Sequence, residues 1–429
     1  MNKIPFLLML FIASGCASVK NLDSEVNKKE VDRLLRTLSS DEMQGRKTFT
    51  PAIDKAADFI AAEFKRIGLK QMDGVSGYKQ TFTMYKATTK SLSATINGEK
   101  IDPKNVAVIS TAENIKVDGT TGYTKAYVKK GGNLGAEINK IANSTDNVIL
   151  FVDTSFSARF KRISASSGYM FQKKNNLVLV LVPGEVSSFS IEASQELTTA
   201  NAQNVVGILP GKSKKDEEVI FSGHYDHIGV GKAVEGDSIY NGANDDASGI
   251  TAVITIANYF KKAKNNERTL VFVAFTAEEM GGYGSRHFSE KLNAEKVVAM
   301  FNLEMIGTES KWGKNSAYIT GFSETNMGAL LQKNLEGSAF TFHPDPYPQQ
   351  QLFYRSDNAT LARLGVPAHT ISTSKMDVEV NYHKVSDEIE TLDTNNMAAI
   401  IRAIIASSTS IVSGKDTPTR VKVEGLRQR

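Results

Sequence analysis

The stretch Thr269–Gly282, TLVFVAFTAEEMGG, is the part of the sequence from which the fold is best inferred. A run of apolar residues ends in two adjacent carboxylates, Glu278 and Glu279. Two like charges side by side at the end of a buried strand repel each other, so a cation is one explanation for the pair. The rest of the chain would then have to supply the other ligands of that cation.

Short apolar strands alternate with helical stretches from Asn204 onward. The strands are NVVGILPG, EVIFSGHYD, TLVFVAFT, VVAMFNLEMIG and VPAHTIST, and DASGITAVITIANYFKK has the pattern of a helix. This alternation predicts an α/β fold with a mostly parallel twisted sheet and helices on both faces. Ligands in such sheets gather at the carboxyl ends of the strands.

Candidate polar residues occur in five places along the chain, four of them at or just after a strand end. The candidates are His224, Asp245, Glu278, Glu279, Glu304 and His383. Taken alone, His224 is as compatible with a hydrogen-bonded histidine of the core as with a metal ligand. Asp245 alone is compatible with a helix cap. Together they form an imidazole and carboxylate set that suits zinc. Glu278 and Glu279 can then be neighbours if one binds the metal and the other acts on its water.

The composition is that of a soluble globular protein and excludes several classes. The 429 residues are 41% apolar and 23% charged, and the net charge is +4 with scattered basic residues, so nucleic acid is not an expected partner. The chain has no HExxH helix and no GxSxG elbow. Its single cysteine, Cys16, lies in the N-terminal segment and leaves no thiol for catalysis.

The N-terminal segment MNKIPFLLMLFIASGC has the layout of a secretory signal. Its apolar core is too short to span a bilayer, and its end resembles a bacterial lipobox with Ala13 where Leu is usual. The segment is either a plain signal peptide that contains a Cys or, as we expect, a lipoprotein signal with lipidated Cys16. The mature chain would be exported and anchored to the bacterial cell envelope, and Ala17 favours the outer membrane.

The remaining organisation follows from local patterns. We expect a signal peptide at 1–16, N-terminal helices at 17–85, a β-rich insertion at 86–200, the catalytic domain at 201–413 and a flexible basic tail at 414–429. Within the second segment, Pro51 can begin a helix and Gly68 can end it. The insertion contains no His and no dense acidic cluster, so it is not expected to carry the chemistry.

The set of motifs resembles the co-catalytic zinc exopeptidases of metallopeptidase family 28. The matching pieces are SGHYDH, NGANDDASG, FTAEEMGGYGS, FNLEMIG, FYRSDNATLARLGVPA and NYHKVSDEIETLD, in the family's order over residues 204–410. The segment EMQGRKTFTPAIDKAADFIAAEFKRIGLK is similar to the family's N-terminal helices. The resemblance implies the zinc-exopeptidase type of α/β fold, also called phosphorylase/hydrolase-like, and the insertion weakly resembles a protease-associated domain.

The resemblance also implies roles for individual residues. Asp245 would bridge two zinc ions, with Glu279 and His383 completing one site and His224 and Glu304 the other. Glu278 would be the general base, Asp226 would orient the ring of His224, and Tyr382 would help to stabilise the oxyanion. Two positions depart from the family pattern: Glu304 stands where many members have Asp, and Asn358 where His is frequent.

The function implied is that of a metallo-aminopeptidase whose partner is a peptide with a free N-terminus. A glutaminyl cyclase, which has the same fold and one zinc, remains the main alternative. A carboxypeptidase that releases acidic residues is a third reading, although no arginine cluster is evident for it. The alternative that is not an enzyme is a surface receptor with the same fold. The complete ligand set and the presence of Glu278 argue against it.

Overall fold

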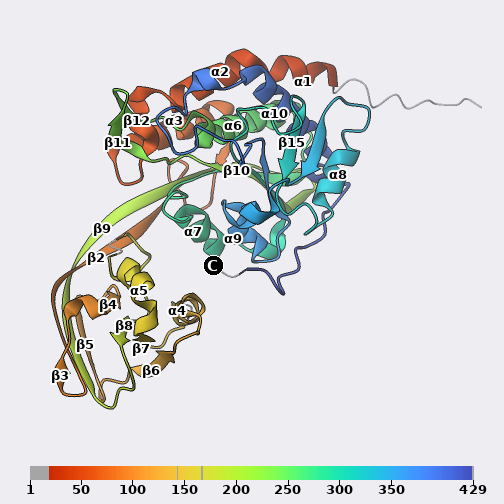
Figure 1. The fold of residues 1–429 in the computed structure, drawn as a ribbon. Coiled ribbons are helices and arrows are strands. Elements are labelled where there is room, and N and C mark those ends of the chain that lie inside the picture. Colours follow the sequence, from red (N-terminus) through yellow and green to blue (C-terminus); the bar gives the residue numbers. More distant parts are fainter. Residues whose placement is uncertain (1–18, 143, 166–167, 428–429) are drawn as a thin grey trace, which may run out of the picture. The chain divides into compact units, whose positions relative to one another are not determined.

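The computed structural model describes residues 19–142, 144–165 and 168–427. The chain divides into two compact units, one made of the residues up to 81 and from 202 onward, the other of residues 82–201. Two long strands, β2 (Lys79–Ile96) and β9 (Phe189–Leu209), run from one unit into the other (Figure 1). The expected signal segment, with Cys16, lies outside the described residues. None of the described helices is both long and apolar enough to cross a membrane.

The larger unit is built on a sheet with the strand order β16-β15-β17-β14-β10-β13-β9. Most neighbouring strands in its centre are parallel, namely β10 with β13, β10 with β14 and β14 with β17, whereas β9 is antiparallel to β13. The prediction of a mostly parallel sheet is therefore confirmed. The strand bounds are β10 Lys214–His224, β13 Arg268–Phe275, β14 Val297–Leu303, β15 Ser316–Ile319, β16 Thr341–Pro344 and β17 Ala368–Ser372, and the short β1 (Lys70–Gln71) pairs with β9.

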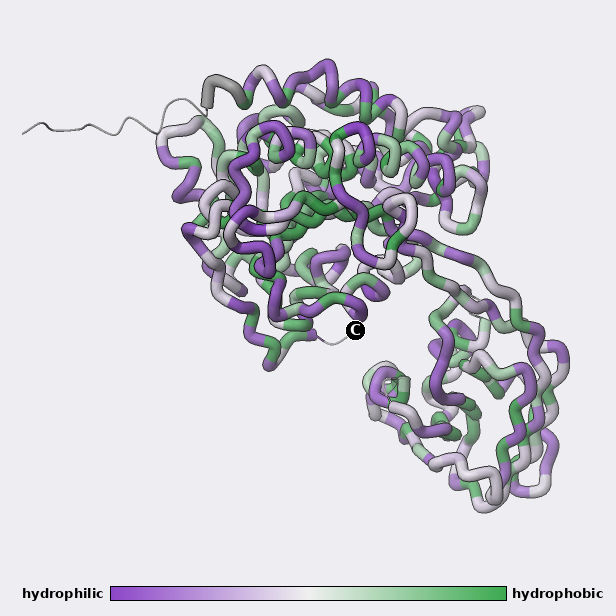
Figure 2. The backbone as a smooth tube through the Cα atoms, turned by 180° about the vertical axis from the view of Figure 1, so that it is seen from behind, coloured by the Kyte–Doolittle hydropathy of each residue, from purple (hydrophilic) through white to green (hydrophobic). Residues whose placement is uncertain are grey.

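Helices cover both faces of this sheet (Figure 1). One face carries α2 (Lys28–Leu38), α3 (Pro51–Ile67), α6 (Ser248–Ala263) and α10 (Thr394–Val412), and the other carries α7 (Tyr283–Lys291) and α9 (Asn358–Ala362). As expected, Pro51 begins α3 and Gly68 ends it with a φ of 80°. Figure 2 shows the hydrophobic residues concentrated along the central strands of this unit. The remaining elements are α1 (Val19–Glu25), α8 (Met327–Lys333) and the hairpin β11 (Gly229–Val234) and β12 (Asp237–Tyr240).

The smaller unit has a sheet of its own with the order β4-β8-β7-β6. Its elements are β4 Val106–Ile109, β6 Thr124–Val128, β7 Val148–Asp153, β8 Leu177–Val182, α4 Leu134–Ala142 and α5 Ser157–Ser164. Two further strands, β3 (Glu99–Lys100) and β5 (Asn114–Asp118), pair with the parts of β2 and β9 that belong to this unit.

The segment after α10 is not the flexible tail that its basic composition suggested. Val421 and Leu426 are 4% and 9% exposed and pack in the same core as α7 and α9. The guanidinium of Arg420 donates to the carbonyl of Val297 at 2.8 Å. The expectation was wrong because spaced apolar residues in a charged segment give no periodic signal, although each of them fills a gap in the core.

The three central strands of the larger unit end level with one another. In the parallel register, His224 at the end of β10 is opposite Phe275 at the end of β13, and Ser222 is opposite Asn302 of β14. The residues that follow these ends therefore meet at one edge of the sheet. This register brings Glu278, Glu279 and Glu304 close to His224.

Candidate metal centre

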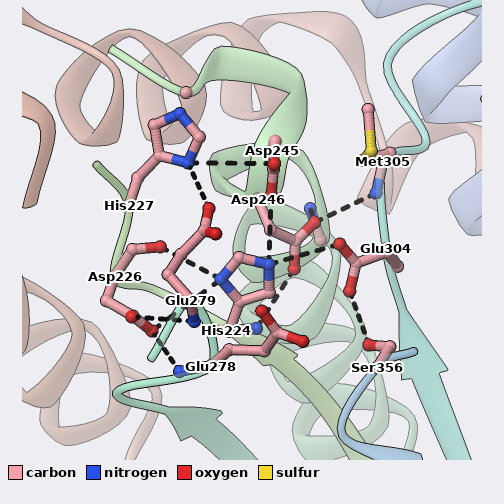
Figure 3. A network of polar contacts seen from close by, with 12 residues as sticks. His224, Asp226, His227, Asp245, Asp246, Glu278, Glu279, Glu304, Met305 and Ser356 are labelled. Carbon is pink, nitrogen blue, oxygen red and sulfur yellow. Dashed lines mark hydrogen bonds and ion pairs between the residues drawn. The ribbon is translucent and has the colours of Figure 1, made fainter. Parts of the chain in front are cut away.

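The first half of the centre joins three elements at the sheet edge (Figure 3). His224 ends β10, Glu304 directly follows β14, and Asp245 lies in the turn that precedes α6. The Nε2 atom of His224 is 3.1 Å from Oδ1 of Asp245 and 3.2 Å from Oε1 of Glu304. These are three of the residues that the sequence placed at one site.

The second half uses the other oxygen of Asp245. The Nε2 atom of His383 is 3.3 Å from Oδ2 of Asp245 and 3.2 Å from Oε2 of Glu279. His227 approaches the same carboxylates, with its Nδ1 atom 2.8 Å from Oε1 of Glu279 and 3.8 Å from Oδ2 of Asp245. Asp245 therefore lies between two groups that each combine imidazole and carboxylate.

These residues fit divalent zinc. Zinc bonds of about 2.0–2.2 Å in a tetrahedron place ligand atoms about 3.3–3.5 Å apart, and the separations around Asp245 are close to that range. Oδ1 of Asp245 is buried, and its 3.1 Å contact with Nε2 of His224 lacks the geometry of a hydrogen bond. A buried carboxylate oxygen without a partner is costly, so a cation bound there would satisfy it.

The pKa values of the neighbouring Glu278 and Glu279 are shifted in opposite directions. This explains how two carboxyl groups can lie side by side at the end of a buried strand. Burial raises the pKa of Glu278 well above its usual value, and the nearby charges of Asp357 and Glu304 add to the effect. Burial acts in the same direction on Glu279, but its contacts with the imidazoles of His227 and His383 outweigh it and bring the pKa of Glu279 to about 2. Glu279 is thus suited to bind a cation as a carboxylate, and Glu278 is suited to hold a proton.

Asp226 contacts the ring of His224 through its main chain and not through its carboxylate. Its Oδ1 atom is 3.8 Å from Nδ1 of His224, too far for a hydrogen bond. The backbone carbonyl of Asp226 instead lies 3.0 Å from that nitrogen. The carboxylate accepts hydrogen bonds from the backbone amides of Glu278 and Glu279 at 3.0 and 3.3 Å. Asp226 therefore orients the ring through its main chain and fixes the two glutamates through its side chain.

The turn that carries Asp245 is held from both sides by carboxylates. Asp387 accepts hydrogen bonds from the backbone amides of Asn244 and Asp245 at 2.8 and 3.0 Å. Asp246 accepts from the backbone amide of His224 at 3.1 Å and from that of Met305 at 3.1 Å. Burial raises the pKa of Asp387 to about 6. These bonds fix the strand ends and the turn relative to one another.

A buried arginine ties the same loops to the N-terminal helices. The side chain of Arg46 is 0% exposed, and its guanidinium donates only to main-chain carbonyls, at 2.6–2.9 Å. These carbonyls belong to Leu38, Tyr225, Asn241 and Gly242. One side chain therefore connects the end of α2 to the loops that precede His227 and Asp245.

The two residues that depart from the family pattern, Glu304 and Asn358, both form hydrogen bonds with neighbouring residues. The hydroxyl of Ser356 donates to Oε2 of Glu304 at 2.6 Å, which leaves Oε1 directed at His224. Asn358 is fully buried, donates to the carbonyl of Phe353 at 3.0 Å and accepts from the hydroxyl of Thr370 at 2.8 Å. The longer side chain of Glu304 is thus held so that one oxygen still faces the centre. Asn358 stabilises the start of α9.

A pocket opens beside Glu304. Its lining contains Tyr318, Leu352, Met376 and several hydroxyl side chains, and Tyr382 forms part of its wall. The Tyr382 ring stacks on His383 with the ring centres 3.9 Å apart. Burial and the charges of the nearby carboxylates raise the pKa of the Tyr382 hydroxyl, so it stays protonated and can donate a hydrogen bond.

Sequence reasoning missed His227 and Arg46 as members of the site. His227 lies three residues after His224 in the quoted HYDH, so the only signal was a second imidazole next to the first. Arg46 lies in EMQGRK, where a lone basic residue is normally solvated. Neither position could be assigned before the loops were folded together.

The fold and the centre together define an α/β protein with a candidate metal centre at the carboxyl edge of its sheet. Residues 204–408 match the model of Peptidase family M28. Aminopeptidase YwaD of Bacillus subtilis (strain 168) is 31% identical over 31% of this chain and 28% of its own length. A probable zinc metalloprotease of Pyricularia oryzae is 34% identical over 30% of this chain and 26% of its own. The matched segments thus span less than a third of these relatives.

Solved structures extend the likeness in fold to nearly the whole chain. An aminopeptidase from Aneurinibacillus sp. strain AM-1 superposes with a TM-score of 0.54 at 18% identity, covering 94% of this chain and 97% of the other. BSAP, a zinc aminopeptidase from Bacillus subtilis, superposes with a TM-score of 0.54 at 16% identity and the same coverages. These neighbours establish a shared fold.

Proposed function

We propose that the protein is a zinc-dependent aminopeptidase with two zinc ions. The observation that carries this proposal is Asp245, whose two oxygens face two separate imidazole–carboxylate groups within one cluster. The relatives named above, an aminopeptidase and a probable zinc metalloprotease, support peptide hydrolysis and zinc. In this proposal, Glu279 and His383 would hold one ion, His224 and Glu304 would hold the other, and Asp245 would contribute to both sites.

The reaction adds water across the first peptide bond. When bound, zinc lowers the pKa of the attacking water and polarises the scissile carbonyl. Glu278 accepts the proton from that water and delivers it to the leaving amine. The protonated hydroxyl of Tyr382 donates a hydrogen bond to the oxygen of the carbonyl as negative charge develops there.

The position of Glu304 favours the amino end of the substrate. Glu304 borders both the metal cluster and the pocket, so the pocket begins at an anionic side chain. A free α-amino group can approach this carboxylate while the first side chain enters the pocket. Cleavage would then follow the first residue. An N-acetyl group would remove the positive charge and fill the space that the amine needs.

The test compares a short peptide with its N-acetylated twin by mass spectrometry, using the purified chain without its N-terminal segment. We expect stepwise loss of single residues from the free peptide, no cleavage of the twin, loss of activity in chelator and recovery with zinc. Metal analysis of the active protein should give close to two zinc per chain. Equal cleavage of both peptides, internal cuts or full activity after complete metal removal would contradict the proposal.

The same assay separates the alternatives. A peptide with N-terminal Gln would be converted to pyroglutamate without hydrolysis by a glutaminyl cyclase, which the relatives named above support less than a peptidase. Loss of a C-terminal acidic residue would indicate the carboxypeptidase. A protein that binds zinc and peptide without any turnover would be the receptor.

We also propose that the chain is an exported lipoprotein anchored through Cys16 to the bacterial cell envelope, at the outer membrane. The signal-like segment that ends in Gly15-Cys16, with Ala17 after it, motivates the proposal. We expect Cys16→Ser to move the full-length protein from the membrane fraction to a soluble one and to abolish labelling by a fatty-acid analogue. A variant that still pellets with membranes and still takes up the label would refute the anchor.

A further inference from the structure

We propose that His227 is a third histidine ligand of the metal centre and that its Nδ1 atom binds the same zinc ion as Glu279 and His383. The inference rests on the proposed function for the identity of the metal. The ligand set inferred from the family resemblance contains only two histidines, His224 and His383. Nothing in that set gives His227 a role, although it is the histidine nearest to Glu279.

The geometry around Glu279 is the first argument. His227 and His383 approach Glu279 and Asp245 from different directions, with their rings 5.7 Å apart at an angle of 71°. Each ring presents one nitrogen to both carboxylates. The donor atoms of His227, Asp245 and Glu279 all lie within 4.8 Å of one another. With His383, which contacts the same two carboxylates, four side chains gather at this half of the centre, and four is the usual number of ligands for zinc.

The fixed position of the His227 ring is the second argument. His227 is 1% exposed, and its backbone amide donates to the carbonyl of Arg46 at 3.2 Å. The ring lies against Gly242, where a Cβ atom would be 2.6 Å from the ring carbon Cδ2 and where φ is +56°. Only glycine leaves room for the ring at this backbone conformation. The chain thus holds the imidazole at the carboxylates before any ion arrives.

The Nδ1 atom of His227 can either bind the metal or donate a proton to Glu279, and the arrangement of the site favours metal binding. The Nε2 atom of His227 is buried with no hydrogen-bond partner among the described residues. It is unpaired whether Nδ1 binds metal or donates a proton to Glu279, so its burial does not separate the readings. A proton on Nδ1 would occupy Oε1 of Glu279, whereas a lone pair on Nδ1 leaves both oxygens of Glu279 and the ring directed at the ion.

The consequence is that the two metal sites differ. One site would have four protein ligands, His227, Asp245, Glu279 and His383, and the other only three, His224, Asp245 and Glu304. Zinc sites that are closed by four protein groups hold the ion structurally, and sites with three leave a position for water or substrate. The open position would thus lie on the Glu304 side, next to the pocket, and the first equivalent of zinc would enter the His227 side.

The decisive experiment determines the tautomer of His227 in the metal-loaded protein. The chain has six histidines, so ¹⁵N labelling of their rings gives a small set of signals, and loss of one set in His227→Gln assigns the residue. We expect a proton on Nε2, none on Nδ1, and a coupling between Nδ1 and ¹¹³Cd after substitution of the zinc. A proton on Nδ1 without that coupling would show that His227 only supports Glu279 by a hydrogen bond, and would overturn the inference.

A binding measurement supplies the second arm. Competition with a zinc-binding dye should show that His227→Gln weakens the tighter zinc site by more than about 100-fold, beyond the 10–100-fold usual for a residue that only supports a ligand. The matched control is His343→Gln, which also removes one histidine. The His343 ring stacks on Trp312, and this variant should bind zinc like the wild type. An unchanged tight site in His227→Gln would contradict the inference. Neither arm uses peptide hydrolysis, so failure of the aminopeptidase proposal would be seen separately.

Discussion

Glu278→Gln is expected to fold, to keep its metal and to lose about 10²–10⁴-fold in turnover, the range that general acid–base transfer contributes. The amide has nearly the shape of the carboxyl but cannot accept a proton. The backbone of Glu278 stays in place because the hydrogen bond that holds it runs from its amide to Asp226. The measurement is kcat on an N-terminally free peptide, together with zinc content and the thermal midpoint.

The matched control is its neighbour, Glu279→Gln. Contacts with two imidazoles lower the pKa of Glu279 against the effect of burial, and an amide could not replace its charge beside a cation. This variant should lose zinc affinity first and recover part of its activity when zinc is raised. If Glu278→Gln lost metal and Glu279→Gln lost only turnover, the roles of the two glutamates would be reversed.

Arg46→Ala is expected to have the largest effect on stability. The substitution leaves four buried carbonyls without their donor and empties the space between α2 and the loops of the metal centre. A buried acceptor left unsatisfied costs about 1–3 kcal/mol, and several are affected together here. We therefore expect a marked fall in the thermal midpoint and, because the loops of His227 and Asp245 lose their tie, weaker zinc binding. Arg46→Lys should recover little, since one ammonium cannot reach carbonyls on opposite sides.

Arg36→Ala is the matched control for this prediction. Arg36 is on α2 as well, but its ion pair with Glu390 is exposed on both sides, at 61% and 69%. Exposed pairs contribute about 0–1 kcal/mol, so the thermal midpoint should hardly move. Equal midpoints for the Arg46 and Arg36 variants would mean that the buried guanidinium does not hold the loops together.

The sequence alone determined the elements and the kind of chemistry. Strand and helix periods differ, so runs such as TLVFVAFT and the face of Ile53, Ile60 and Phe64 could be assigned from spacing. Parallel strands end at one edge of the sheet, and this rule is enough to place Glu279 near His224. The identity of these side chains then pointed to zinc.

Only the tertiary structure decided which atoms meet. His227 faces Glu279 because Gly242 leaves room for its ring, and Arg46 is buried because carbonyls from the end of α2 and from two loops surround it. Asp226 serves His224 through its carbonyl and not through its carboxylate. Val421 and Leu426 join a core that their basic surroundings conceal. Spacing along a chain encodes which face of an element a residue occupies. Contacts between loops depend on register and backbone direction, which are set only when distant segments pack together.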